Sequence, residues 1–290
     1  MATTVDNPQA GVSVPAGGEA SRVDARARLA RLGLMALVFM GGATVMAVEM
    51  SASRLLAPYF GTSLFIWANL IGLVMVYLSL GYWLGGKLAD RYPRHSVLYG
   101  ITGIAGFAVG LIPVISRPIL EWSLRGFSEV SVGIFYGSLL GVILLFSVPL
   151  LLLGFVSPFA IRLRSTEVGK AGGTAGGISA LSTLGSIMGT FVSVFLLIPY
   201  IGTAATLYLA AAVLLFFSLI GLLSVGAMKP AAIFGGLLAV VLALAFLVPR
   251  GIIKPPDRGE LLYERESAYN YIQVIKEQGD IKLVLNEGQA

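Results

Sequence analysis

The chain has 290 residues, of which 57% are hydrophobic and only 12% are charged. Soluble domains carry roughly 25% charged residues, so this composition excludes an ordinary soluble enzyme and predicts a membrane protein. The absence of cysteine and the single histidine exclude disulfides and thiolate metal sites and leave no metal site to expect. The net charge of +5 does not indicate nucleic acid, because the cations flank apolar segments instead of gathering on one polar face.

Residues 1–31 are predicted to be a disordered, basic N-terminus. Seven apolar segments follow within a transmembrane domain at 32–248, and each reaches the ~20 residues that a helix needs to cross a bilayer. They cover about 32–57, 64–86, 96–116, 130–161, 171–198, 203–228 and 231–248. The fourth is long enough to kink at Pro149 and Pro158, and Pro199 to Gly202 supply the turn between the fifth and sixth.

The distribution of basic residues predicts the orientation of these helices. Eleven arginines and lysines flank the segment ends on the N-terminal side, and two flank the opposite ends. The eleven are Arg22, Arg26, Arg28, Arg31, Lys87, Arg91, Arg94, Arg162, Arg164, Lys170 and Lys229, against Arg117 and Arg125. This imbalance predicts a cytoplasmic N-terminus, and seven crossings then place the C-terminal tail outside.

The tail differs in kind from the membrane part. Residues 249–262 are predicted to form a linker marked by Pro255 and Pro256. Two stretches of strand-like composition follow at Tyr269–Ile275 and Ile281–Leu285, which predicts a β-hairpin in 263–290. A lone hairpin is marginally stable in water, so we interpret it as the start of a truncated soluble domain.

Two charged residues, Glu49 and Arg54, lie in the first apolar segment and are the candidates for a substrate or ion site. Five helical residues correspond to a rotation of about 140°, so the two do not share a face. Glu49 lies about 26 Å beyond Leu32 at ~1.5 Å per residue, toward the outer leaflet. Either Glu49 faces a cavity and binds a cation or proton, or it pairs with a neighbouring helix while Arg54 reaches the interface.

The turn after the second segment resembles the loop at the same place in major facilitator transporters, through Gly86, Asp90, Arg91 and Arg94. That resemblance implies a cytoplasmic latch that takes part in gating. The alternative is a basic stop signal in which Asp90 pairs locally.

The fifth segment carries Gly173, Gly177, Gly185 and Gly189 along one helical line. Small residues in this register let another helix approach closely, so we interpret them as a packing face, with a substrate-lining face as the alternative.

Four blocks in this order resemble one family. They are EMSASRLLAPYFGTSLFIW with GYWLGGKLADRYPR, AGGISALSTLGSIMGTFVSVFLLIPYIGT, and the tail ESAYNYIQVI with LVLNEGQA. Together they resemble bacterial membrane-fused spermidine synthase-like proteins. The resemblance implies a facilitator-like, all-α transmembrane region in the bacterial inner membrane, followed by the start of a polyamine aminopropyltransferase domain.

The same resemblance implies cofactor-binding positions at Tyr269, Asn270 and Gln289, where Asn270 stands in place of the family's glutamine. The co-substrate of a complete synthase domain would be decarboxylated S-adenosylmethionine, which is expected in the cytoplasm. The family's glycine-rich cofactor loop and catalytic acids are expected beyond this sequence or on a partner chain. We therefore expect no catalytic residue, no cofactor and no metal within residues 1–290.

Three functions remain open at this point. The first is the membrane part of a polyamine-synthesising protein, which anchors the chemistry or moves its amine. The second is a facilitator-like transporter of polyamines or other small cations, which at seven helices would need a homodimer. The third is a structural anchor in the lipid bilayer for a partner chain.

Overall fold

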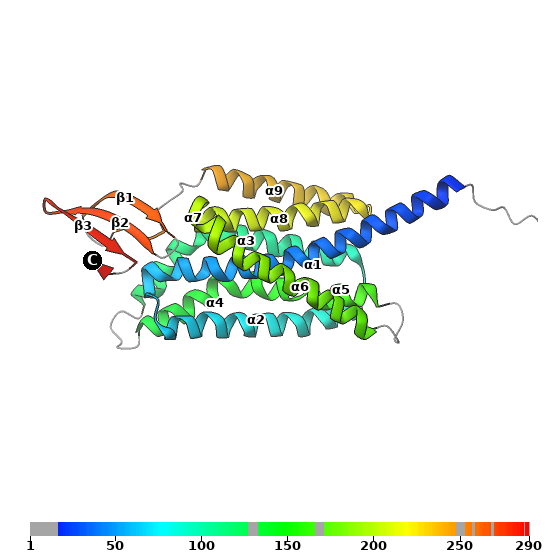
Figure 1. Ribbon diagram of the computed structural model, residues 1–290, viewed down its shortest axis with the longest axis horizontal. Coiled ribbons are helices and arrows are strands. Elements are labelled where there is room, and N and C mark those ends of the chain that lie inside the picture. Colours follow the sequence, from blue (N-terminus) through cyan, green and yellow to red (C-terminus); the bar gives the residue numbers. More distant parts are fainter. Residues whose placement is uncertain are drawn as a thin grey trace, which may run out of the picture.

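The computed structural model describes residues 17–126, 133–165, 171–247, 253–256, 259–267, 270–286 and 288–289. Its helices form an elongated bundle, with a small sheet at one end and the N-terminal part of α1 protruding at the other (Figure 1). Within the described residues, seven helical spans are long and apolar enough to cross a membrane, which confirms the predicted number. They are Ala30–Phe60, Leu64–Arg91, His95–Arg125, Gly133–Arg164, Ala171–Ile201, Thr203–Ser224 and Met228–Leu247.

The individual helices divide these spans more finely. They are α1 (Gly17–Phe60), α2 (Leu64–Arg91), α3 (His95–Arg125), α4 (Gly133–Gly154), α5 (Val156–Arg164), α6 (Ala171–Val192), the π-helical turn η2 (Ser193–Leu197), α7 (Ile198–Ile201), α8 (Thr203–Ser224) and α9 (Met228–Leu247). The predicted disorder of residues 1–31 is wrong from residue 17 onward, because α1 already begins at Gly17. The stretch rich in alanine and arginine that follows has high helix propensity. Residues 1–16 lie outside the described part.

The fourth span is broken between α4 and α5, at Phe155. Pro158 has no N–H to donate to the carbonyl of Gly154, which interrupts the hydrogen-bond ladder there, whereas Pro149 lies inside α4. A β-carbon on Gly154 would lie 3.0 Å from the Cα of Gly81 in α2. The break therefore occurs where the backbones of two helices touch.

The fifth span ends in a second irregularity, the π-helical turn η2 followed by α7. Pro199 supplies no N–H to this ladder, and Gly202 ends the span with φ +85°, a conformation that side chains disfavour. The predicted turn between the fifth and sixth helices is therefore present, with its sharp point at Gly202.

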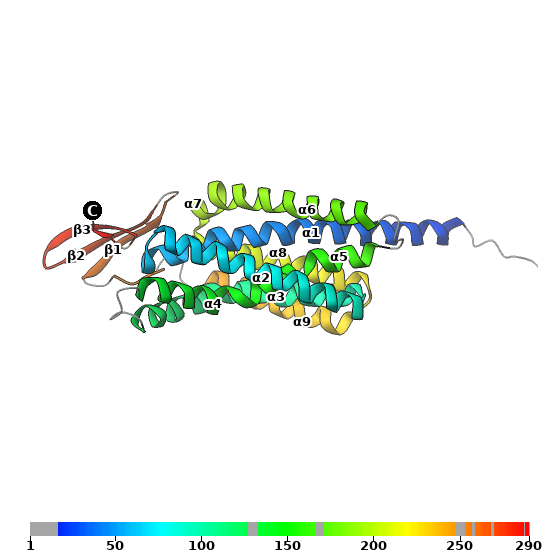
Figure 2. The same ribbon diagram turned by 90° about the horizontal axis from the view of Figure 1, so that it is seen from below.

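Helix α1 is central, and α6, α8 and α4 pack around it. Figure 2 shows α6 on one side of α1 and α9 on the opposite side of the bundle. The predicted glycine packing face is used only in its C-terminal half. A β-carbon on Gly185 would overlap the carbonyl oxygen of Phe39, and one on Gly189 would lie 2.6 Å from the Cα of Ala43. Within the described part of the chain, Gly173 and Gly177 have nothing within 4 Å of such an atom.

The sheet is an antiparallel meander in the order β1 (Glu260–Glu266), β2 (Tyr271–Glu277), β3 (Asp280–Leu285) and β4 (Gly288–Gln289). Strands β2 and β3 form the predicted hairpin, and Gln278 and Gly279 in its turn both have positive φ. Strand β1 was not predicted, and its first residues fall in the predicted linker. The sequence ELLYERE gives no clear strand signal, because four of its seven residues are charged.

Candidate functional site

Glu49 and Arg54 line two different cavities, as their angular separation on the first segment predicts. Glu49 opens onto a cavity of about 240 Å³ between helices of the bundle. Arg54 lines a cavity of about 400 Å³ where the bundle meets the sheet. The two charges are therefore not partners within α1, and each has its own surroundings.

The Glu49 cavity is lined by residues of five helices, α1, α2, α4, α5 and α6. Its polar lining comes from three serines, Ser157 of α5 and Ser182 and Ser186 of α6, with Tyr82 of α2. The apolar lining includes Val45, Met46, Ile71, Val74, Met75, Leu78, Leu153 and Val156. Glu49 is the only acidic or basic residue among those that line this cavity.

Close glycine contacts position this cavity. A β-carbon on Gly42 would overlap the carbonyl oxygen of Ser182, and the hydroxyl of Ser186 donates to the carbonyl oxygen of Gly42 at 3.2 Å. The approach of α6 to α1 thus brings both serines next to Glu49. No hydrogen bond or ion pair joins the Glu49 carboxylate to another residue in the described part of the chain, which favours the interpretation in which it faces a cavity.

The Arg54 cavity is bounded by α1, α2, the end of the fifth span and two loops of the sheet. Its polar lining consists of Ser53, Arg54, Thr62, Asn270 and Asn286. Asn286 follows β3 and donates from Nδ2 to Oδ1 of Asn270 at 3.0 Å. Its own Oδ1 accepts the N–H of Tyr271 at 3.0 Å, so the two loops are held together at the cavity.

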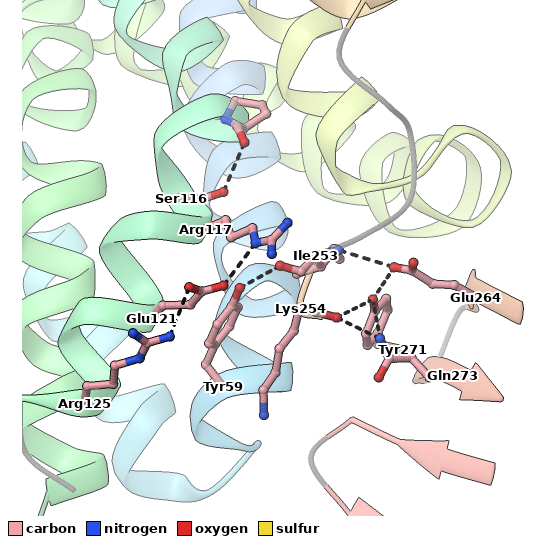
Figure 3. Close-up of polar contacts among 11 residues, drawn as sticks. Tyr59, Ser116, Arg117, Glu121, Arg125, Ile253, Lys254, Glu264, Tyr271 and Gln273 are labelled. Carbon is pink, nitrogen blue, oxygen red and sulfur yellow. Dashed lines mark hydrogen bonds and ion pairs between the residues drawn. The ribbon is translucent and has the colours of Figure 1, made fainter. Parts of the chain in front are cut away.

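A network of polar contacts docks the sheet on the bundle beside this cavity (Figure 3). The Tyr59 hydroxyl at the end of α1 donates to the carbonyl oxygen of Ile253 at 2.6 Å. The N–H of Ile253 donates to Glu264 at 3.2 Å, and Tyr271 donates its hydroxyl hydrogen to the same carboxylate. Gln273 Nε2 donates to the carbonyl oxygen of Lys254 at 2.7 Å. The segment around Ile253 is therefore held from both sides.

A second docking contact joins β1 to α8. The Glu266 carboxylate accepts hydrogen bonds from the N–H of Thr203 at 3.0 Å and from the Thr203 hydroxyl. Thr203 is the first residue of α8, so the carboxylate from the sheet caps the positive end of this helix. Burial raises the pKa of Glu266, although the hydrogen bonds from Thr203 and the charge of Arg54 act in the opposite direction. Burial likewise raises the pKa of Glu264.

At the opposite end of the bundle, Asp90 accepts a hydrogen bond from Arg162 Nε of α5 at 2.8 Å. The end of α2 is thereby connected to the helix that follows the break at Phe155. Arg91 lies 5.6 Å from the ring of Tyr92, and Arg94 directly precedes α3. Among the described residues, none lies within 4 Å of a β-carbon placed on Gly86. Of the proposed latch residues, Asp90 is thus the one that joins two helices.

The remaining sequence candidates lie in the tail. Tyr269 falls outside the described residues, Asn270 lines the Arg54 cavity, and Gln289 lies in β4 opposite Val284. In the described part of the chain there is no group of three or more histidine, aspartate or glutamate residues that could hold a metal ion. Sequence reasoning missed Thr203 and Glu266, and only the proline–glycine turn before Thr203 hinted at a helix start there.

Comparisons of the chain with protein-family models, with curated proteins and with solved structures find no match. The function must therefore be argued from the two cavities and the contacts around them.

Proposed function

We propose that the chain is a polytopic inner-membrane protein that binds a small organic cation, an amine, at Glu49 and moves it through the bundle. In this proposal the N-terminus is cytoplasmic and the sheet is the beginning of a spermidine synthase-like domain at the outer surface. The observation that carries the proposal is a carboxylate in a cavity within a membrane span, without a protein cation among the described residues. Ionisable residues in membrane spans are costly and usually mark ion or substrate pathways.

The chemistry of the cavity supports a cationic ligand. Glu49 offers a negative charge, and the hydroxyl oxygens of Ser157, Ser182 and Ser186 can accept hydrogen bonds. Its volume of about 240 Å³ lies below the ~300 Å³ at which cavities for drug-sized ligands begin. An ammonium group with a short carbon chain suits this size, and the resemblance to polyamine-synthesising proteins favours an amine over a metal cation.

The position of α5 supports movement of the ligand as well as binding. This helix has nine residues, with Ser157 at the cavity and Arg162 paired to Asp90 at the N-terminal end of the bundle. A shift of α5 about the break at Phe155 would change the cavity and the Asp90–Arg162 pair together. Such a device corresponds to the latch that the facilitator resemblance implies, and a second copy of the chain would complete a facilitator-sized assembly.

A second candidate function is anchoring of a soluble domain or partner chain. The observation in its favour is the docking of the sheet through Glu266 and Thr203 and through Tyr59 and Ile253. A partner that carried the glycine-rich loop and catalytic acids of a synthase would supply decarboxylated S-adenosylmethionine chemistry. Anchoring needs the docked sheet and does not need Glu49, which separates the two functions.

The test is flux of labelled putrescine in proteoliposomes that contain the purified chain. We expect Glu49→Gln to reduce flux by about tenfold or more, because hydrogen bonds to charged groups contribute roughly 1.5–3 kcal/mol and 1.4 kcal/mol is a factor of ten. The matched control is Glu121→Gln, which removes a carboxylate paired with Arg117 outside the cavity. Equal flux in Glu49→Gln and wild type would remove Glu49 from the mechanism. Competition by sodium but not by spermidine would assign the cavity to an inorganic cation.

A further inference from the structure

The cavity at the junction of bundle and sheet has the opposite character from the Glu49 cavity. Among its lining residues, Arg54 is the only ionisable one. The nearby Glu266, which interacts electrostatically with Arg54, does not line the cavity and already binds the N-terminus of α8 through Thr203. A ligand in this cavity therefore meets a positive charge and no carboxylate.

The amide groups of the two asparagines add hydrogen-bond donors. Because Asn286 donates to Oδ1 of Asn270, the Asn270 amide presents its Nδ2 as the remaining polar atom. That nitrogen makes no hydrogen bond within the described part of the chain. Thr62 adds a hydroxyl, whereas the Ser53 hydroxyl hydrogen is directed to the carbonyl oxygen of Met50 at 2.8 Å. A guanidinium and a free amide N–H₂ together favour a ligand rich in acceptors.

The rest of the lining is apolar and comes from the membrane helices. Apart from Gly61, it consists of Met50, Ala57, Ile66, Trp67, Leu70, Val194 and Ile198. The volume of about 400 Å³ lies within the ~300–1,000 Å³ of small-molecule cavities. Next to the lining residues Ile66 and Trp67, at the start of α2, the side chains of Leu64 and Phe65 are 87% and 70% exposed.

We infer that this junction cavity binds an amphipathic anion, with its acidic group on Arg54 and Asn270 and its hydrocarbon part against α2 and the end of the fifth span. The acidic group is a carboxylate or a phosphate, and the source is either a free fatty acid or an anionic lipid of the surrounding bilayer. The ligand would contact both the bundle and the two sheet loops, so its binding stabilises the docked sheet. This site is independent of the amine site at Glu49.

The experiment uses the fluorescence of Trp67, which lines the cavity. In a Trp83→Phe, Trp122→Phe background it is the only tryptophan, since the chain has three. Quenching by a bromine-labelled dodecanoate is measured in nanodiscs of neutral phosphatidylcholine and compared with quenching by the equally labelled dodecanol at the same bilayer content. We expect saturable extra quenching by the acid, and no such component from the alcohol.

Two variants test the recognising residues. We expect Arg54→Gln to weaken the apparent affinity about tenfold or more and Asn270→Ala about three- to tenfold. The control Arg125→Gln removes an exposed arginine at the same end of the bundle and should change nothing. Each variant is first shown to keep the wild-type melting temperature in nanodiscs, and Asn270→Ala, which lies outside the membrane spans, remains informative if Arg54→Gln does not fold.

The possible outcomes distinguish the two sources of the ligand from each other and from the case in which the inference is wrong. Displacement of the labelled acid by phosphatidylglycerol in the nanodisc identifies membrane lipid as the ligand, and its absence identifies a free amphipathic acid. Equal quenching by acid and alcohol, or unchanged affinity in both Arg54→Gln and Asn270→Ala, would overturn the inference. A loss of amine flux in Glu49→Gln has no bearing on it, because the two cavities share no lining residue.

Discussion

The contact between Glu266 and Thr203 makes a quantitative prediction for the docking of the sheet. Glu266→Ala removes the acceptor of the Thr203 N–H and of its hydroxyl, and Thr203 is fully buried. Hydrogen bonds to charged groups contribute roughly 1.5–3 kcal/mol, and a buried donor left without a partner costs about 1–3 kcal/mol. We therefore expect docking to weaken by about 2–3 kcal/mol, which raises the undocked population roughly 30- to 150-fold.

Glu266→Gln is the informative counterpart of this variant. The glutamine keeps an acceptor oxygen in the same place and loses only the charge. Burial raises the pKa of Glu266. The docked state therefore tolerates the neutral form of this side chain better than an exposed position would. We therefore expect Glu266→Gln to dock nearly as well as wild type at neutral pH, within about 1 kcal/mol.

The raised pKa of Glu266 also determines how docking of the sheet depends on pH. A carboxyl whose pKa is raised in the docked state binds its proton more tightly there. Docking of the wild-type sheet is therefore strongest below the ordinary glutamate pKa of about 4.3 and weakens as the pH rises through the raised pKa. Glu264, whose pKa is also raised by burial, contributes with the same sign, so Glu266→Gln should reduce this dependence without abolishing it.

Hydrogen–deuterium exchange of β1 and β2 in detergent or nanodiscs measures the docking. An isolated small sheet is marginally stable, so undocking exposes its amides to exchange. The control is Glu260→Ala, which removes an exposed carboxylate from the same strand. Unchanged exchange in Glu266→Ala would refute the capping contact. Equal acceleration in Glu266→Ala and Glu266→Gln would show that the charge, and not the acceptor, holds the sheet.

Two further predictions concern the bundle. Gly185→Ala should lower the melting temperature in detergent, because its methyl group would overlap α1 and overpacking costs about 1–3 kcal/mol. Gly173→Ala, with open space around it, should leave the melting temperature unchanged or slightly raise it, and equal losses would contradict the packing described. A double-mutant cycle of Asp90→Asn and Arg162→Gln should give a coupling below about 1 kcal/mol, because the two side chains are 73% and 46% exposed. A coupling of several kcal/mol in unfolding measurements would instead make this pair a main tie between α2 and α5.

The membrane spans could be predicted from the sequence because each crossing needs a long apolar run, and few charged residues interrupt those runs. The departures arise where local chemistry competes with that rule. Pro158 breaks the fourth span at Phe155, and the residues before Pro199 adopt a π-helical turn. Both irregularities occur where a proline supplies no N–H to the helical hydrogen-bond ladder.

The sequence could predict individual candidate residues, but not which residues come together at a site. Glu49 and Arg54 stand out because charge in an apolar run is costly, and their angular separation correctly places them in different surroundings. Their partners come from distant segments. In the sequence, Glu266 is one of several charged residues in a polar stretch, and Thr203 is only the expected first residue of a helix. Only the folded chain shows that the first caps the second.

The architecture also bears on what the sheet can do. An odd number of spans places the sheet and the start of α1 at opposite ends of the bundle, as in Figure 1. If the N-terminus is cytoplasmic, as the basic residues predict, the sheet lies outside, away from a cytoplasmic nucleoside co-substrate. Asn270, the position expected to bind that co-substrate, lies instead against the membrane helices in the Arg54 cavity. On the proposed orientation, the placement of Asn270 agrees with the membrane ligand that we infer for this cavity and not with the expected co-substrate.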